Sequence, residues 1–275
     1  MSFKIKLVFL LMICCFAVYL KPAASREYSV GIVPQFDARR IVQIWKPILD
    51  AVSKESGIQL DLVGSPNIPQ FEIAFNAGKF DFAYMNPYHL VVAEKYQGYT
   101  PLVKDTGRKL FGVLVVRKDS PIRNIADLEG KTVAFPSPNA LGAALMFRAE
   151  FSSRYDIKYT SKFVKSHSSV YLNVVLGQTD AGGGVQKTLQ QQSAKIRDAL
   201  RIVHETPKVA PHPFAVHPRV ETAVRESIRK AFLQLGQSEQ GKKMLASVPI
   251  KEIGTASMSD YEPLQEMGLE KYYVK

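Results

Sequence analysis

The chain has 275 residues and a formal net charge of +11, with 36 lysines and arginines against 25 aspartates and glutamates. Both of its cysteines, Cys14 and Cys15, lie near the N-terminus, so the chain beyond them can form no disulfide, thiol nucleophile or cysteine-ligated metal site. The positive charge favours anionic ligands, but the basic residues are scattered rather than clustered, and we expect no nucleic-acid partner.

The N-terminus has the pattern of a secretory signal peptide. Two lysines precede an apolar run over residues 7–20, and small residues follow it, which predicts cleavage after Ser25 and export to the periplasm. The run is shorter than the roughly 20 residues that span a bilayer, and Met12 and Ile13 are not the small residues that lipoprotein processing favours. A retained anchor and a lipoprotein are therefore the weaker alternatives. Loss of residues 1–25 removes three lysines and no acid, which takes the formal charge from +11 to +8.

Short apolar strands and amphipathic helices alternate from Tyr28 onward. Strands are predicted over 28–33, 58–63 and 80–85, and helices over 37–56 and 68–78 and from Pro87. Glycines after helices and a proline in a first turn support these boundaries. The alternation predicts an α/β protein with parallel strands and right-handed crossovers.

A second block of similar size follows. Strands are predicted over 110–116, 132–135, 158–164 and 200–205, and helices from Ala140, over 167–176 and over 185–199. The proline-rich passage "TPKVAPHPFAVHP" then leads to helices over 220–236 and 239–247. This order predicts two lobes joined by two crossing strands, with residues 26–112 and 213–275 in one lobe and 113–212 in the other.

Ligands of open α/β sheets bind beyond the carboxyl ends of the strands, where this chain has the loops "VPQF", "YMNPYH", "FPSPNA", "VKSHSS" and "DAGGG". The loop "FPSPNA" leads into a helix whose first N–H groups lack internal partners and carry the positive end of the dipole. We therefore expect an anion cradle there, although Ala140, Leu141 and Gly142 supply no hydroxyl.

The other loops allow two interpretations each. In "YMNPYH", Tyr84, Asn86, Tyr88 and His89 form a ligand-contacting wall, or Asn86 is only a helix N-cap followed by proline. His167 either lies at the ligand beside two serines, or is a surface residue before an N-cap at Ser168. The segment "DAGGG" either lets another part of the backbone approach closely or is a plain turn.

Catalytic and metal-binding patterns are weak. His212 and His217 flank "PFAV" on a predicted strand, where they face opposite sides and lack a third ligand at useful spacing. The chain has no Gly-x-Ser-x-Gly, no His-Glu-x-x-His and no glycine-rich phosphate loop with its lysine. We expect no metal, no cofactor and no enzymatic activity; a hydrolase or metal enzyme is the weaker alternative.

Three segments carry a family resemblance: "FDFAYMNPYHLVVA", "KDSPIRNIADLEGKTVAFPSPNALGAAL" and "SHSSVYLNVVLGQTDAGGGVQKTL". In this order and spacing they resemble the periplasmic phosphonate-binding protein family of ABC transporters, a branch of the type II solute-binding proteins, over essentially the whole mature chain. The resemblance implies two α/β lobes that close on a small ligand in their cleft and present it to a permease and its ATPase.

The chain also departs from this family. Members that bind phosphonates typically have a Ser-Thr-Ser run where this sequence has Ala140, Leu141 and Gly142, and each lost hydrogen bond to a charged group is worth roughly 1.5 to 3 kcal/mol. His212 replaces an acidic residue that suits a ligand amine. These departures favour a small oxyanion or an uncharged oxyacid over an aminoalkyl phosphonate.

The leading hypothesis is an exported, monomeric solute-binding protein that captures a phosphonate-like or other oxyanion. The predicted site has backbone donors, a side-chain wall and two closing histidines, which are Asn139, Ala140 and Leu141 with Ser137, then Tyr84, Asn86, Tyr88 and His89, and finally His167 and His212. The alternative is a periplasmic sensor of the same fold that docks on a histidine kinase.

Overall fold

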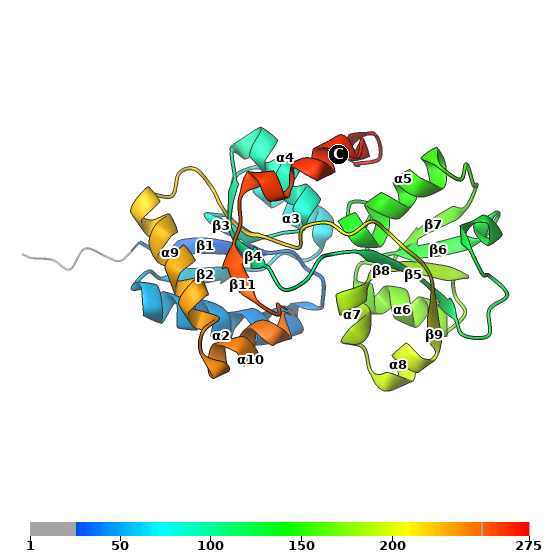
Figure 1. The fold of residues 1–275 in the computed structure, drawn as a ribbon, viewed down its shortest axis with the longest axis horizontal. Helices are drawn as coiled ribbons and strands as arrows, with labels where there is room; N and C mark the ends of the chain where they lie inside the picture. Colours follow the sequence, from blue (N-terminus) through cyan, green and yellow to red (C-terminus); the bar gives the residue numbers. More distant parts are fainter. Residues whose placement is uncertain (1–25, 249, 275) are drawn as a thin grey trace, which may run out of the picture.

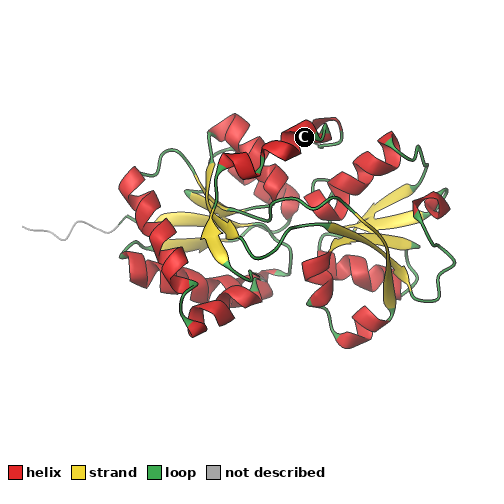
Figure 2. Cartoon of the chain, viewed as in Figure 1, coloured by secondary structure: helices red, strands yellow, loops and turns green. Residues whose placement is uncertain are grey.

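The computed structural model describes residues 26–248 and 250–274, so the predicted signal peptide and its cleavage site lie outside the described residues. The chain forms two lobes side by side, each a β-sheet with helices on both faces (Figures 1 and 2). The sheets have six and five strands, in the orders β11-β4-β10-β3-β1-β2 and β7-β6-β8-β5-β9. This arrangement confirms the predicted two-lobed α/β class.

The first lobe contains both ends of the described chain. Its strands are β1 (Tyr28–Ile32), β2 (Leu60–Val63), β3 (Phe82–Tyr84), β4 (Thr100–Asp105), β10 (Phe214–Val216) and β11 (Ile253–Thr255). Its helices are α2 (Ala38–Ser56), α3 (Ile68–Asn76), α4 (Pro87–Gln97), α9 (Thr222–Leu235), α10 (Glu239–Ser247) and α11 (Glu262–Glu266), with short 3₁₀ turns η3 (Met258–Asp260) and η4 (Leu269–Lys271).

The second lobe is formed by the middle of the chain. Its strands are β5 (Gly112–Arg117), β6 (Thr132–Phe135), β7 (Thr160–Phe163), β8 (Ala181–Val185) and β9 (Leu200–Glu205). Its helical segments are the 3₁₀ turn η1 (Ile125–Leu128), the π-helical turn η2 (Leu141–Leu145), and helices α5 (Met146–Ser153), α6 (His167–Val175), α7 (Gln186–Gln190) and α8 (Ala194–Asp198).

The sheets are mixed, so the prediction of parallel strands was only partly right. Strands β1, β2 and β3 pair in parallel, as do β6, β7 and β8. Strand β10 pairs antiparallel with β3 and β4, and β5 pairs antiparallel with β8 and β9. The reason is the connectivity. A strand that arrives from the other lobe enters its sheet from the side at which the parallel strands have their carboxyl ends, so it runs in the opposite direction.

The two passages between the lobes run next to each other. The chain leaves β4 for β5 and returns from β9 to β10, and Leu110 and Val209 exchange N–H···O bonds of 2.9 Å in both directions. The Thr206 hydroxyl also accepts the Gly112 N–H at 2.7 Å. These bonds tie the crossing segments together beside the inter-lobe contact.

Helix ends in the first lobe follow their sequence signals. The Asp37 carboxylate accepts the N–H of Arg40 at 3.0 Å at the start of α2, and Gly57 ends this helix in the left-handed region at φ 71°. The Asn86 side chain caps α4 by accepting the His89 N–H at 2.8 Å. The capping interpretation of Asn86 is therefore confirmed.

Two local predictions in the second lobe were wrong. Helix α6 is capped by Ser166, whose hydroxyl accepts the Ser169 N–H, and not by Ser168. The helix predicted over 185–199 is broken into α7 and α8. The buried Gln192 side chain turns back to donate to Thr188 O at 2.8 Å between them, and Val185 belongs to the preceding strand.

The segment "DAGGG" lies largely in β8, a fully buried strand between β5 and β6, and is not a turn. Its glycines are required by close neighbours. A Cβ atom on Gly183 would lie 2.1 Å from Ala143 O, and one on Gly184 would lie 2.1 Å from the Tyr171 hydroxyl oxygen. The interpretation of these glycines as sites of close approach is confirmed, and it brings η2 directly against the sheet.

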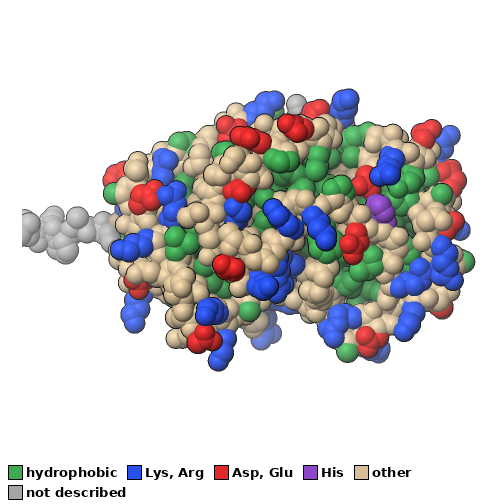
Figure 3. Space-filling model, viewed as in Figure 1, with side chains coloured by type: hydrophobic (Ala, Val, Ile, Leu, Met, Phe, Trp, Pro, Cys, Tyr) green, Lys and Arg blue, Asp and Glu red, His purple; other side chains and the backbone are tan. Residues whose placement is uncertain are grey.

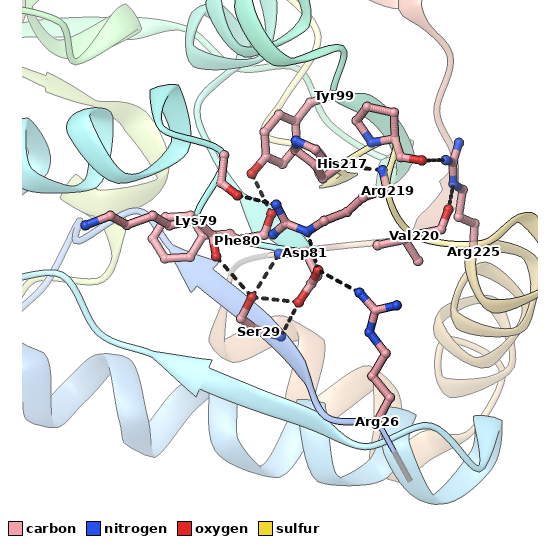
Figure 4. A network of polar contacts seen from close by, with 12 residues as sticks. Arg26, Ser29, Lys79, Phe80, Asp81, Tyr99, His217, Arg219, Val220 and Arg225 are labelled. Carbon is pink, nitrogen blue, oxygen red and sulfur yellow. Dashed lines mark hydrogen bonds and ion pairs between the residues drawn. The ribbon is translucent and has the colours of Figure 1, made fainter. Parts of the chain in front are cut away.

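A buried carboxylate joins distant parts of the first lobe (Figure 4). Asp81, just before β3, accepts the Ser29 N–H at 2.9 Å and the Arg219 Nε–H at 2.6 Å. Burial alone would raise the pKa of Asp81, but the hydrogen bonds from Arg219 and Ser29 outweigh it and hold the pKa below its usual value. The carboxylate therefore links β1 and β3 to the chain after β10. His217 lies in this cluster, where its Nδ1 accepts the Arg219 N–H at 3.1 Å.

Basic and acidic side chains are interspersed over both lobes on the face shown in Figure 3. Among the helices of residues 26–248 and 250–274, none is long and apolar enough to cross a bilayer.

Candidate ligand-binding site

A small cavity lies between the two lobes at the carboxyl ends of the parallel strands. Its volume is about 20 Å³, enough for a water molecule. The first lobe and the returning crossing segment contribute Val33, Gln35, Ile68, Asn86 and His212, and the second lobe contributes Ala140, Leu141, Gly142, Ala143, His167 and Val185. We call this space the inner cavity of the cleft.

The turn η2 brings free backbone donors to this cavity. It begins after Ala140, whose carbonyl accepts the N–H groups of both Ala144 and Leu145, at 2.7 and 3.1 Å. The N–H groups of Leu141, Gly142 and Ala143 have no acceptor among the described residues. Such N–H groups at the positive end of a helix bind anions, and π-helical turns are frequent at functional sites.

The set of donors differs from the predicted one by a shift along the chain. The Ala140 N–H already donates to Ser137 O at 3.3 Å. Asn139, the other predicted donor, does not line the cavity. The N–H groups of Gly142 and Ala143 are free instead, because the first N–H groups of a helix have no partner within it. Leu141 is common to both sets.

His212 forms part of the wall opposite the donors. Its ring stacks on Tyr84, with centroids 5.4 Å apart, and its Nε2 lies 3.2 Å from the Gln35 side-chain nitrogen. An amide nitrogen only donates, so Nε2 accepts and the neutral ring carries its proton on Nδ1. Burial, and then the nearby Lys187 ammonium, lower the pKa of His212 well below its ordinary value. The ring is therefore neutral at pH 7.

His167 lies on the second lobe and is also neutral. Burial lowers its pKa to about 4. Its Nδ1 is 3.2 Å from the Thr188 hydroxyl, which itself donates to Val185 O at 2.9 Å. The Thr188 hydroxyl also lies 2.8 Å from the Tyr171 hydroxyl, which itself donates to Val185 O at 3.0 Å. A neutral imidazole has one donor and one acceptor nitrogen, so the ring of His167 can pair with a ligand oxygen in either role.

A second polar cluster joins the lobes beside the cavity. The Asn139 side chain donates to Glu72 at 3.0 Å and to Val274 O at 2.7 Å, and accepts the Val274 N–H at 2.9 Å. Glu72 also bonds His89 Nε2 at 2.9 Å, and the Asn86 side chain donates to Asn139 O at 3.2 Å. The Asn139 amide is thus used fully by contacts between the lobes and with the C-terminal segment.

A buried ion pair lies on the other side of the contact. Lys187 Nζ in α7 is 3.1 Å from the carboxylate of Asp105 at the end of β4, and this carboxylate is 1% exposed. Backbone N–H groups of Gly107, Lys251 and Glu252 also donate to Asp105. The carboxylate is therefore well satisfied, and the lysine connects α7 to the first lobe.

The predicted site residues fall into two groups. Five of them line the inner cavity: Asn86, Ala140, Leu141, His167 and His212. The other five support it or lie elsewhere. Tyr84 packs behind His212, Ser137 is buried with no hydroxyl partner among the described residues, Asn139 and His89 belong to the Glu72 cluster, and Tyr88 faces Tyr273 in a groove outside the cleft.

Several residues that line the inner cavity or lie in the polar cluster beside it were not predicted. Gln35 comes from "VPQF", a loop whose position was indicated but whose glutamine was not singled out. Gly142 and Ala143 have no polar side chain, so only helix geometry could identify them. Glu72 lies within a helix, where a single acid gives no pattern that distinguishes it from a surface residue.

Comparisons with known proteins agree with this architecture. A family model described as "ABC transporter, phosphonate, periplasmic substrate-binding protein" matches residues 30–261. The phosphonates-binding periplasmic protein of Escherichia coli K12 is 21% identical over 272 residues, covering 92% of this chain and 80% of that protein. The phosphate-import protein PhnD of Mycolicibacterium smegmatis is 22% identical over 228 residues, covering 75% and 71%.

Solved structures share the fold. A binding protein component of an ABC phosphonate transporter from Pseudomonas aeruginosa superposes with a TM-score of 0.81 at 16% identity, over 90% of this chain and 87% of that one. PhnD1 from Prochlorococcus marinus, in complex with methylphosphonate, has a TM-score of 0.80 at 16% identity, over 91% and 100%. The fold matches those of type II periplasmic binding proteins, and the family model spans most of the chain. The chain therefore belongs to the family of periplasmic phosphonate substrate-binding proteins of ABC transporters.

Proposed function

We propose that this protein is exported to the periplasm, captures a small oxyanion of the phosphonate or phosphate kind between its lobes, and delivers it to an ABC permease and its ATPase. The observation that carries the proposal is the convergence of the free N–H groups of Leu141, Gly142 and Ala143 on a cavity between the lobes. Backbone donors at a helix start bind negative oxygens without a charged side chain.

The side chains around the donors refine this chemistry. Asn86 and Gln35 are amides, and His167 and His212 are neutral imidazoles with lowered pKa values. An anion in the cavity would favour the protonated imidazoles, so binding and proton uptake are coupled. A ligand that carries both an ionised and a protonated oxygen fits this set of donors and acceptors.

The size of the inner cavity requires movement of the lobes. A phosphonate has at least five non-hydrogen atoms, whereas about 20 Å³ holds a water. The lobes must therefore separate to admit the ligand and close around it less tightly than in this structure. The two crossing segments, which hydrogen bonds between Leu110 and Val209 and between Gly112 and Thr206 hold together, form a suitable hinge.

A proline substitution tests the backbone donors directly. Leu141 is the first residue of η2, where proline is tolerated because the N–H has no helical partner, and Ala140 before it is already extended, at ψ 100°. Leu141→Pro removes one donor; Leu141→Ala removes a similar amount of side chain but keeps the donor. We expect the proline variant to lose anion affinity by roughly tenfold or more relative to the alanine variant.

The ligand class is tested by thermal unfolding with phosphate, phosphite, methylphosphonate and aminoethylphosphonate. A ligand at about 100 times its dissociation constant adds roughly 2.7 kcal/mol, which raises the melting temperature by roughly 5 to 10 °C for a protein of this size. If no member of the panel raises it, the phosphorus-oxyanion proposal is wrong. Equal affinities for the proline and alanine variants would exclude the backbone cradle.

A further inference from the structure

A second and larger chamber lies in the cleft next to the inner cavity. Its volume is about 290 Å³, near the lower end of the roughly 300 to 1,000 Å³ range of small-molecule sites. The ends of β1 and β2, the first turns of α2 and the start of α3 form most of its wall, and Lys165 and Ser166 before α6 complete it from the second lobe. We call it the outer chamber.

The outer chamber and the inner cavity are built from the same three chain segments. In residues 32–36, Val33 and Gln35 line the inner cavity and the residues that alternate with them line the outer chamber. Residues 67 and 68, and residues 166 and 167, divide in the same way. The two spaces are thus neighbours on opposite sides of a wall one residue thick. Residues 32–36, 67 and 68 of this wall belong to the first lobe and residues 166 and 167 to the second, so opening of the lobes would separate these two parts and join the two spaces.

The lining of the outer chamber is mainly apolar. Most of its lining residues are hydrophobic, among them Ile32, Phe36, Ile41, Leu62 and Val63. The polar side chains of Asp37, Asn67 and Ser166 each cap their own helix by accepting a backbone N–H of its first turn. Most of the chamber wall therefore offers a ligand van der Waals contact rather than hydrogen bonds.

Two opposite charges lie at the chamber, the carboxylate of Asp37 and the ammonium of Lys165. Lys165 has φ 74°, in the left-handed region that non-glycine residues rarely adopt and that often marks functional sites. Because the two charges offset each other, the chamber has no net preference for a charged ligand group.

We propose that the ligand of this protein is an oxyanion with an apolar substituent about the size of an aromatic ring, held with its head group at the η2 donors and its substituent in the outer chamber. This inference rests on the proposed function, since it takes the anion cradle as the site of the head group. It adds the chemical class of the rest of the ligand and the residues that select it.

Calorimetric titration of the mature protein with methylphosphonate, phenylphosphonate and aminoethylphosphonate tests the proposal. Burial of a phenyl ring in an apolar chamber predicts that phenylphosphonate binds roughly tenfold or more tightly than methylphosphonate. Tightest binding of aminoethylphosphonate would overturn the proposal and assign Asp37 to a ligand amine.

A substitution that fills the chamber separates the two parts of the site. Gly64 lines the chamber, is exposed, and has no heavy atom within 4 Å of the position its Cβ would take. Gly64→Phe is expected to fold, to keep its affinity for methylphosphonate and to lose the added affinity for phenylphosphonate. Gly64→Ala, the matched control, should retain that added affinity.

The failures of the two proposals give different results. If methylphosphonate and phenylphosphonate bind with equal affinity and Gly64→Phe changes neither, the chamber proposal is wrong and the oxyanion function stands. If none of the three compounds binds, both proposals fail. A Gly64→Phe variant that loses both ligands while its melting temperature is unchanged would also refute separate binding of head group and substituent.

Discussion

The free donors of η2 can be tested without any ligand by adding a helix cap. Ala140 occupies the N-cap position of η2, with φ −66° and ψ 100°, and no side chain caps this turn. A serine there can accept the N–H of Gly142 or Ala143, which have no acceptor among the described residues. An N-cap of this kind stabilises a protein by about 1 kcal/mol, and Ala140→Ser should therefore raise the melting temperature by about 2 to 4 °C.

The matched control is Ala144→Ser in the same turn. Ala144 is fully buried and its N–H already donates to Ala140 O at 2.7 Å, so a hydroxyl there is buried without a free donor and costs roughly 1 to 3 kcal/mol. Calorimetric unfolding of both variants gives the comparison. A fall in stability for Ala140→Ser as large as that for Ala144→Ser would refute the conclusion that these N–H groups are free.

Three further predictions concern packing, protonation and closure. Gly183→Ala places a Cβ 2.1 Å from a main-chain carbonyl oxygen of η2 and should lower the stability measured by thermal unfolding by about 1 to 3 kcal/mol. Gly64→Ala, in open space, should change it by less than about 0.5 kcal/mol. Equal effects of the two substitutions would contradict the close packing of η2 on β8. Burial lowers the pKa of His167 from 6.5 to about 4, so the unfolded chain binds more protons than the folded one between these pH values. Roughly 3 kcal/mol of the free energy of unfolding, present above pH 6.5, is therefore lost as the pH falls to 4. In denaturant unfolding, His167→Gln should lack this part of the pH dependence, and an unchanged profile would exclude it. Asn139→Asp places a second carboxylate about 3.0 Å from Glu72 and should separate the lobes, seen as a larger radius of gyration in small-angle X-ray scattering; an unchanged radius would show that this contact does not hold the cleft closed.

Local signals in the sequence were sufficient for most of the elements that position the site. Helix α2, predicted over 37–56, begins directly after Asp37 and ends at Gly57, and α4 begins after Asn86. The loops "VPQF", "YMNPYH", "FPSPNA" and "VKSHSS" all contribute to the cleft. These features depend on residues close together in the chain, which is why periodicity and capping patterns identify them.

Long-range contacts determine the features of the site that the sequence patterns did not predict. Asn139 and His89 follow the same signals as the cavity-lining residues, but Glu72 binds both of them and removes their side chains from the cavity. The glycines of "DAGGG" predict a loop that is either a site of close backbone approach or a plain turn. In the structure η2 and Tyr171 approach this segment so closely that only glycine, which has no side chain, fits there. Pairing with a strand on each side stabilises the segment as a strand.

The same close packing explains why the cradle relies on backbone donors. The Cβ of any residue larger than glycine at position 142 would lie 3.0 Å from a Val185 methyl group and 3.2 Å from the Gly112 nitrogen, and a Cβ on Gly112 would lie 1.9 Å from Gly142 O. The start of β5 and the turn η2 are thus in contact, and this contact fixes the direction of the three N–H groups. A residue with a hydroxyl side chain at position 142 would require these neighbours to shift by a few tenths of an ångström. If the proposed site binds an oxyanion, its selectivity rests on the backbone donors, the neutral histidines and the contacts of the proposed substituent. Position 140 lies outside the contact between η2 and β5, so a hydroxyl added there can change the cradle without breaking it.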